Sequence, residues 1–170
     1  MDRLVLRAGI IGASMLVGFG ALAQLGGRLD VWSRGYQMGA AWAGVATSDG
    51  GIRLRIFCGD KEAAAANRAI KAGPSLQVAM SKITPPRKTK SIRLVVDRKT
   101  TDLPVAIERV PDAVNFDWKP SRAFDAGRMS RLLTELRDAQ ALRLEIAGAM
   151  REVSLKNIRE ALSEDIIACR

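Results

Sequence analysis

Basic residues gather in one part of this chain, and their most direct chemistry is the binding of anions. Between residues 82 and 99 the only acidic residue is Asp97, and the basic residues are Lys82, Arg87, Lys88, Lys90, Arg93, Arg98 and Lys99. Further arginines alternate along expected strands and would make one sheet face cationic if those strands were neighbours; these are Arg53, Arg55, Arg93 and Arg143. The candidate anion-binding residues are therefore Arg87, Lys88, Lys90, Arg93, Arg53 and Arg55. The alternative is an ordinary solvated face that keeps edge strands from aggregating.

The overall charge also favours acidic partners. The formal net charge is +9 at pH 7, which suits anionic envelope polymers, lipid headgroups or an acidic protein. Many exported proteins are basic without a specific ligand, so the charge alone selects none of these. Aromatic residues do not alternate with the basic ones, and stacking on nucleic-acid bases is therefore not expected.

The chain has two cysteines, Cys58 and Cys169, and no histidine. In an oxidising compartment an even count favours one disulfide, here closing a loop of roughly 110 residues, worth about 4–5 kcal/mol in the chain-entropy model. Two buried thiols are the alternative. The missing histidine excludes Ser-His-Asp and Cys-His catalysis and histidine-containing zinc sites. We expect neither a metal nor a cofactor.

With histidine-dependent catalysis excluded, a pair of carboxylates is the catalytic arrangement that the sequence still allows. Glycoside hydrolysis needs only two such groups. The candidates are Asp49, Asp97, Asp102, Glu108 and Asp117, and the aromatic residues that could form a sugar platform are Trp32, Tyr36, Trp42 and Trp118. Each acid also has an ordinary structural role open to it, such as a turn or a strand end. We therefore expect a protein that is not an enzyme.

The first 23 residues have the three-part layout of a secretory signal peptide. A short basic head is followed by the apolar run Ala8–Gly20 and by the small-residue site Ala21-Leu22-Ala23, which is typical of signal-peptidase cleavage. A retained N-terminal anchor is the alternative, although the run is shorter than the roughly 20 residues that a spanning helix needs. Cleavage would leave a basic chain with no stable membrane span, periplasmic or secreted. We expect residues 24–39 to be a linker, in which Trp32 and Tyr36 are the residues that could dock on the folded body, and residues 40–170 to be one domain.

Alternating and helical periods predict an α+β fold. Apolar residues alternate in several short segments, namely 42–45, 52–56, 76–80, 91–96, 104–108, 114–118, 141–146 and 150–155. Helices are expected over residues 61–71, after Asp125 and after Asn157. Asp125 should be the N-cap of a helix that carries Met129, Leu132, Leu133 and Leu136 along one face, and Asn157 should be the N-cap of one final helix. The pattern indicates an antiparallel sheet or sandwich of about seven short strands with two to three flanking helices. Pro104 is expected at the start of its strand, since proline cannot donate to a sheet.

The C-terminal segment Val153–Cys169, with its Leu-Lys-Asn-Ile-Arg-Glu-Ala-Leu core, resembles two groups of small exported proteobacterial proteins. One is the invasion-associated locus B type, and the other is the periplasmic accessory type of type VI secretion. The resemblance implies a non-enzymatic accessory or host-interaction role and carries over no catalytic residue.

The sequence therefore predicts an exported binding or accessory protein of the bacterial periplasm or cell envelope. Its partner would be an envelope or secretion-system protein. A cationic binder of anionic envelope polymers or lipids is the alternative, and a carboxylate-based glycan hydrolase is less favoured.

Overall fold

A computed structural model describes residues 29–37, 39–66, 72–81 and 89–169. In chain order the elements are β1 (Ser33–Gln37), β2 (Ala40–Ala46), β3 (Ile52–Gly59), α1 (Lys61–Ala66), β4 (Gly73–Ser81), β5 (Ser91–Val96), β6 (Lys99–Val110), β7 (Ala113–Trp118), α2 (Ala126–Asp138), β8 (Leu142–Ile146), β9 (Ala149–Val153), α3 (Ile158–Ala161) and α4 (Glu164–Ile167). The predicted signal peptide lies outside these residues. So do the second half of the predicted helix 61–71 and the loop that holds Lys82, Arg87 and Lys88.

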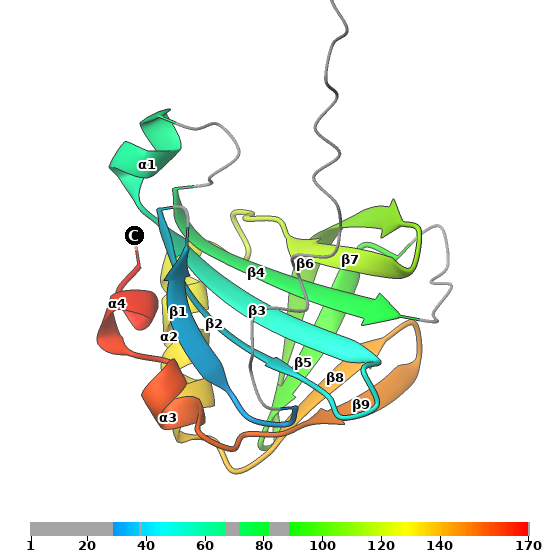
Figure 1. The fold of residues 1–170 in the computed structure, drawn as a ribbon. Coiled ribbons are helices and arrows are strands. Elements are labelled where there is room, and N and C mark those ends of the chain that lie inside the picture. The colour runs from blue at the N-terminus through cyan, green and yellow to red at the C-terminus, as the bar shows by residue number, and fades with distance from the viewer. Residues whose placement is uncertain (1–28, 38, 67–71, 82–88, 170) are drawn as a thin grey trace, which may run out of the picture.

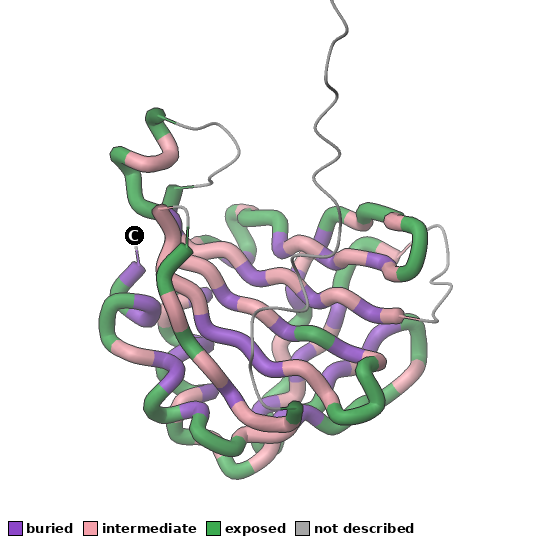
Figure 2. The backbone as a smooth tube through the Cα atoms, in the orientation of Figure 1, coloured by how far each residue is buried: buried purple, intermediate pink, exposed green. Residues whose placement is uncertain are grey.

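The strands form one antiparallel sheet in the order β1-β2-β3-β4-β7-β6-β5-β8-β9. The described residues contain nine strands rather than about seven, in a sheet that curls strongly and carries a few short helices (Figure 1). Alternation decides the faces: Ile52, Leu54 and Ile56 of β3 are buried on the inner face, while Arg53 and Arg55 lie on the outer face. Figure 2 shows the same alternation of buried and less buried residues along the strands.

Helix α2 covers part of the inner face. It contacts β4, α3 and α4, and its buried stripe consists of Met129, Leu132, Leu133 and Leu136. The side chain of Asp125 accepts a hydrogen bond from the Arg128 N–H at the N-cap, as the sequence predicted. The sheet and the helix thus share one continuous core.

Strand β6 explains the curl. Residues 99–104 pair with β5 on one edge, and residues 105–110 pair with β7 on the other. Pro104 lies where the partner changes, so the prediction that it begins the strand is wrong. The missing N–H costs little here because the ladder on that edge ends at this point. The Pro104 carbonyl accepts a hydrogen bond from Lys119 N–H at 2.8 Å.

Residues 29–37 belong to the folded body, so the prediction of a linker over 24–39 is wrong for its described part. Ser33–Gln37 form β1, and the Trp32 side chain is only 1% exposed. Trp32 N–H donates to Lys156 O at 2.9 Å, and its indole Nε1–H donates to Ser154 O at 2.7 Å. These bonds join the segment after β9 to the start of β1 and bring the two ends of the curled sheet together.

The predicted final helix is two helices, α3 and α4. Asn157 has a φ of 67° and makes no side-chain capping bond, so its expected role as an N-cap is wrong. Its side-chain amide instead donates to Trp32 O at 3.2 Å. Asparagine suits this position because it tolerates the left-handed conformation better than most residues.

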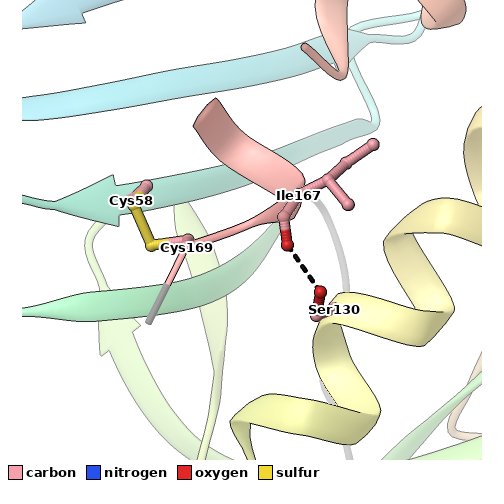
Figure 3. Close-up of a disulfide and its surroundings, with 4 residues drawn as sticks. All are labelled: Cys58, Ser130, Ile167 and Cys169. Carbon is pink, nitrogen blue, oxygen red and sulfur yellow. Dashed lines mark hydrogen bonds between the residues drawn. A yellow bond between two sulfur atoms is a disulfide. The ribbon is translucent and has the colours of Figure 1, made fainter. Parts of the chain in front are cut away.

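The predicted Cys58–Cys169 disulfide is present and ties the end of the chain to β3 (Figure 3). The two Cα atoms are 5.6 Å apart, within the usual range for a bridge. Beside it, Ser130 Oγ of α2 donates to Ile167 O of α4 at 2.6 Å. The bridge and this hydrogen bond hold α4 on the inner side of the sheet.

The β2–β3 turn gives a pH-dependent prediction. The pKa of Asp49 lies below its ordinary value of 3.8, first because the Thr47 hydroxyl donates to its carboxylate and then because the Gly51 N–H does. A lowered pKa in the folded state stabilises the protein above pH 3.8, and this contribution is lost as the pH falls through the folded-state pKa. We expect Asp49→Asn to lower the melting temperature slightly at pH 7 and by less at pH 3. If the difference in melting temperature between the variant and the unchanged protein grew toward pH 3, the predicted direction of the pH dependence would be wrong.

Candidate anion-binding site

A groove of about 460 Å³ lies on the outer face of the sheet. Its floor is formed by β3, β4 and β7, and the β6–β7 turn forms one wall. The lining residues are Gly50, Arg53, Arg55, Gln77, Ala79, Ser81, Val110, Pro111, Asp112, Ala113 and Asn115. This volume is in the usual range for small-molecule sites. The groove is called the outer groove below.

Strand alternation and one glycine place the two arginines. Arg53 and Arg55 are two residues apart on β3, so both side chains emerge on the outer face. Gly44 of β2 is opposite Arg55. A Cβ atom at Gly44 would lie 3.2 Å from Arg55 Cγ and 2.8 Å from Leu54 O. The absence of a side chain at Gly44 therefore leaves room for the arginine stem to lie close to β2.

The charges of these two arginines have no counter-charge in contact with them among the described residues. Neither arginine forms an ion pair within the described residues. Burial lowers the pKa of Arg55, and the nearby charge of Arg53 lowers it further. Like charges that are partly removed from water repel each other. An anion bound between them would relieve both costs.

The opposite side of the outer face carries amides and carboxylates. Gln77 Nε2 donates to Asp117 Oδ1 at 2.9 Å, and Asn115 Nδ2 lies 3.5 Å from Glu108 Oε2. The acids lie on β7 and β6, and the arginines lie on β3. Strand β4 separates the two groups. The face is thus cationic on one side and rich in hydrogen-bonding groups on the other.

The family can be assigned from the region that builds this fold. A family model described as YfjT matches residues 30–162. The chain belongs to the YfjT family. The match runs from just before β1 to just after α3, so it contains all the strands of the described sheet and the outer groove. No curated protein and no solved structure matches the chain.

The other predicted anion-binding residues lie elsewhere. Strands β3 and β5 are separated by β4, β7 and β6, so Arg93 is far along the sheet from Arg53 and Arg55, and the expected continuous cationic face does not form. Arg93 donates to Asp102 and to Glu145, both at 2.9 Å, and these bonds raise its pKa, the one to Asp102 most. Lys90 is exposed just before β5. Arg87 and Lys88 lie outside the described residues.

Three of the five candidate carboxylates have structural roles. Asp49 is held in the β2–β3 turn, and Asp102 pairs with Arg93. Asp97 has a φ of 54° and accepts hydrogen bonds from Gln140 N–H and Ala141 N–H. Glu108 and Asp117 share the outer face. Within the described residues, no group of three potential metal ligands is found.

The aromatic candidates also separate by face. Trp32 and Trp118 are buried in the core, and Tyr36 is 69% exposed on the edge strand β1. Trp42 lies on the outer face, directly opposite Phe57 of β3. The alternation that places Arg53 and Arg55 on the outer face also places Phe57 there, so the sequence alone indicates its position. Alternation along β4 and β7 places Gln77 and Asn115 on the same face, but only the order of the strands brings them beside the arginines.

No helix in the described part of the chain is long and apolar enough to span a membrane.

Proposed function

We propose that this protein is an exported, non-enzymatic binding or accessory protein of the bacterial periplasm or cell envelope, which binds an anionic ligand in the outer groove. The observation that carries the proposal is the pair Arg53 and Arg55, which lie together in the groove without an acidic partner among the described residues. Arginine suits this role because its planar group can donate two hydrogen bonds to a carboxylate or phosphate.

Export is supported by two independent features. The first 23 residues have the layout of a signal peptide, and the Cys58–Cys169 disulfide is typical of an oxidising compartment. Both features agree with a periplasmic or secreted location and with a partner that belongs to the envelope.

Binding without turnover is supported by the arrangement of the acids. Asp49, Asp97 and Asp102 are committed to a turn, to backbone N–H groups and to an arginine. An accessory role toward an envelope or secretion-system protein, which the C-terminal resemblance implies, stays a prediction.

The experiment is site-specific photo-crosslinking in intact bacteria that express the chain. A photoreactive residue replaces Asp112, which is exposed at the rim of the outer groove, or Ala147, which is exposed in the β8–β9 turn. We expect an envelope component to crosslink from position 112 and not from position 147. The double change Arg53→Gln and Arg55→Gln should lower this yield about tenfold or more, because hydrogen bonds to charged groups contribute about 1.5–3 kcal/mol each.

The matched control is Arg98→Gln, which removes a positive charge from the exposed β5–β6 turn. Its crosslinking should equal that of the unchanged protein. An equal loss in this control would indicate non-specific charge attraction and contradict a site in the outer groove. Crosslinking that does not respond to the two arginines would contradict it as well.

A further inference from the structure

We propose that the ligand of the outer groove is an acidic saccharide chain that lies along β3, with its acidic groups at Arg53 and Arg55 and a sugar ring at Trp42 and Phe57. This inference rests on the proposed function and names its ligand class. It follows from three features of the outer face: an aromatic pair, the two arginines, and a row of amide and carboxylate groups.

The aromatic pair adjoins the arginines. Trp42 and Phe57 are direct cross-strand partners on β2 and β3, and both are partly exposed. A Cβ atom added at Gly35 of β1 would lie only 2.9 Å from Trp42 Nε1, so the indole lies over the bare backbone of Gly35. A flat aromatic surface supported from below can stack against the apolar face of a sugar ring.

The polar groups beside the arginines match sugar hydroxyls, which both donate and accept hydrogen bonds. Gln77 and Asn115 supply amides, and Asp117 and Glu108 supply acceptors on the same face. These acids would repel a second anionic group, and they offer nothing to an acyl chain. A saccharide with acidic groups on one side and hydroxyls on the other could bind both to the arginines and to the amide and carboxylate groups. A lipid could bind only to the arginines.

The dimensions favour a chain over a single sugar. Arg53, Arg55 and Phe57 recur every second residue along β3, so the three side chains extend over about 13 Å at about 3.3 Å per residue. The β2–β3 turn at Gly50 and the β6–β7 turn at Pro111 border the groove beyond Arg53. An oligosaccharide could therefore run along β3 from Phe57 toward Gly50.

The test uses the full protein, purified with its disulfide intact, and three probes. These are tetragalacturonate, its fully methyl-esterified form, and vesicles of phosphatidylglycerol. Binding is followed by calorimetry and by tryptophan fluorescence, to which Trp42 contributes from the outer face while Trp32 and Trp118 are buried. We expect tetragalacturonate to bind and its neutral ester to bind at least several-fold more weakly. Arg55→Gln should weaken binding of the acid about tenfold or more, and Arg98→Gln should leave it unchanged.

Trp42→Phe should abolish the fluorescence change and weaken tetragalacturonate binding several-fold without changing the melting temperature by more than a few degrees. An unchanged dissociation constant in this variant would overturn the aromatic part of the proposal. Equal binding of acid and ester, insensitive to Arg55→Gln, would overturn the whole of it.

The two proposals fail in different ways. Arg55-dependent binding of the vesicles, with no binding of tetragalacturonate, would overturn the saccharide and leave the anion-binding function in place. If neither probe binds and position 112 gives no arginine-dependent crosslink in cells, both proposals are wrong.

Discussion

Removal of the Cys58–Cys169 disulfide is expected to lower the free energy of unfolding by about 4–5 kcal/mol. The bridge joins residues 111 positions apart, so it excludes many extended states of the unfolded chain. It also anchors α4, a helix of only four residues, which has little stability of its own. The measurement is urea unfolding of the double variant Cys58→Ala and Cys169→Ala beside the oxidised protein.

Reduction supplies the control for this prediction. The unchanged protein in excess dithiothreitol should unfold at the same urea concentration as the double variant, because both lack the bridge. If the free energy of unfolding fell by less than about 1 kcal/mol in both the reduced protein and the double variant, the unfolded chain would gain little freedom when the bridge is removed. A loss in the variant alone would instead point to packing at the substituted side chains.

Trp32→Ala is expected to lower the free energy of unfolding by about 3–5 kcal/mol. The side chain is 1% exposed, and its Nε1–H donates to Ser154 O. The substitution leaves a large cavity where the start of β1 meets the segment after β9, and it leaves that carbonyl without its partner. Urea unfolding followed by circular dichroism measures the effect without depending on tryptophan fluorescence.

Two further variants separate the contributions at this position. Trp32→Phe keeps most of the buried ring and loses the hydrogen bond, so its effect should be about 1–3 kcal/mol. Tyr36→Ala, at a 69% exposed side chain of β1, the strand that follows Trp32, should change stability by about 0.5 kcal/mol or less. If Trp32→Ala were as mild as Tyr36→Ala, residues 29–37 would be a linker and not part of the core.

Local patterns were sufficient where neighbouring residues decide the structure. The alternation Ile52-Arg53-Leu54-Arg55-Ile56 predicted both faces of β3, because side chains of a strand point to opposite sides. The helical spacing after Asp125 predicted the buried stripe and N-cap of α2. The disulfide could be paired from sequence since only two cysteines exist.

The errors arise where distant residues decide the structure. β1 has no apolar alternation of its own, and it forms because β2 pairs with it and Trp32 is held by Ser154 and Lys156. Pro104 sits within β6 because two different strands pair with the two halves of that strand. The final helix is interrupted at Leu162 and Ser163, whose backbone is not helical between α3 and α4. Asn157, before α3, takes a left-handed conformation and bonds to Trp32 instead of capping the helix.

The sequence by itself determined the charge, the absence of histidine, the cysteine pair and the face on which Arg53 and Arg55 lie. Only the tertiary structure decided which basic residues keep an uncompensated charge. Arg93 and Arg55 have the same alternating context, yet β6 and β8 bring Asp102 and Glu145 to Arg93, whereas β2 and β4 bring Gly44 and Gln77 to Arg55. Strand order, which is set by pairing between distant segments, therefore places Arg93 in an ion pair and leaves Arg55 without one among the described residues.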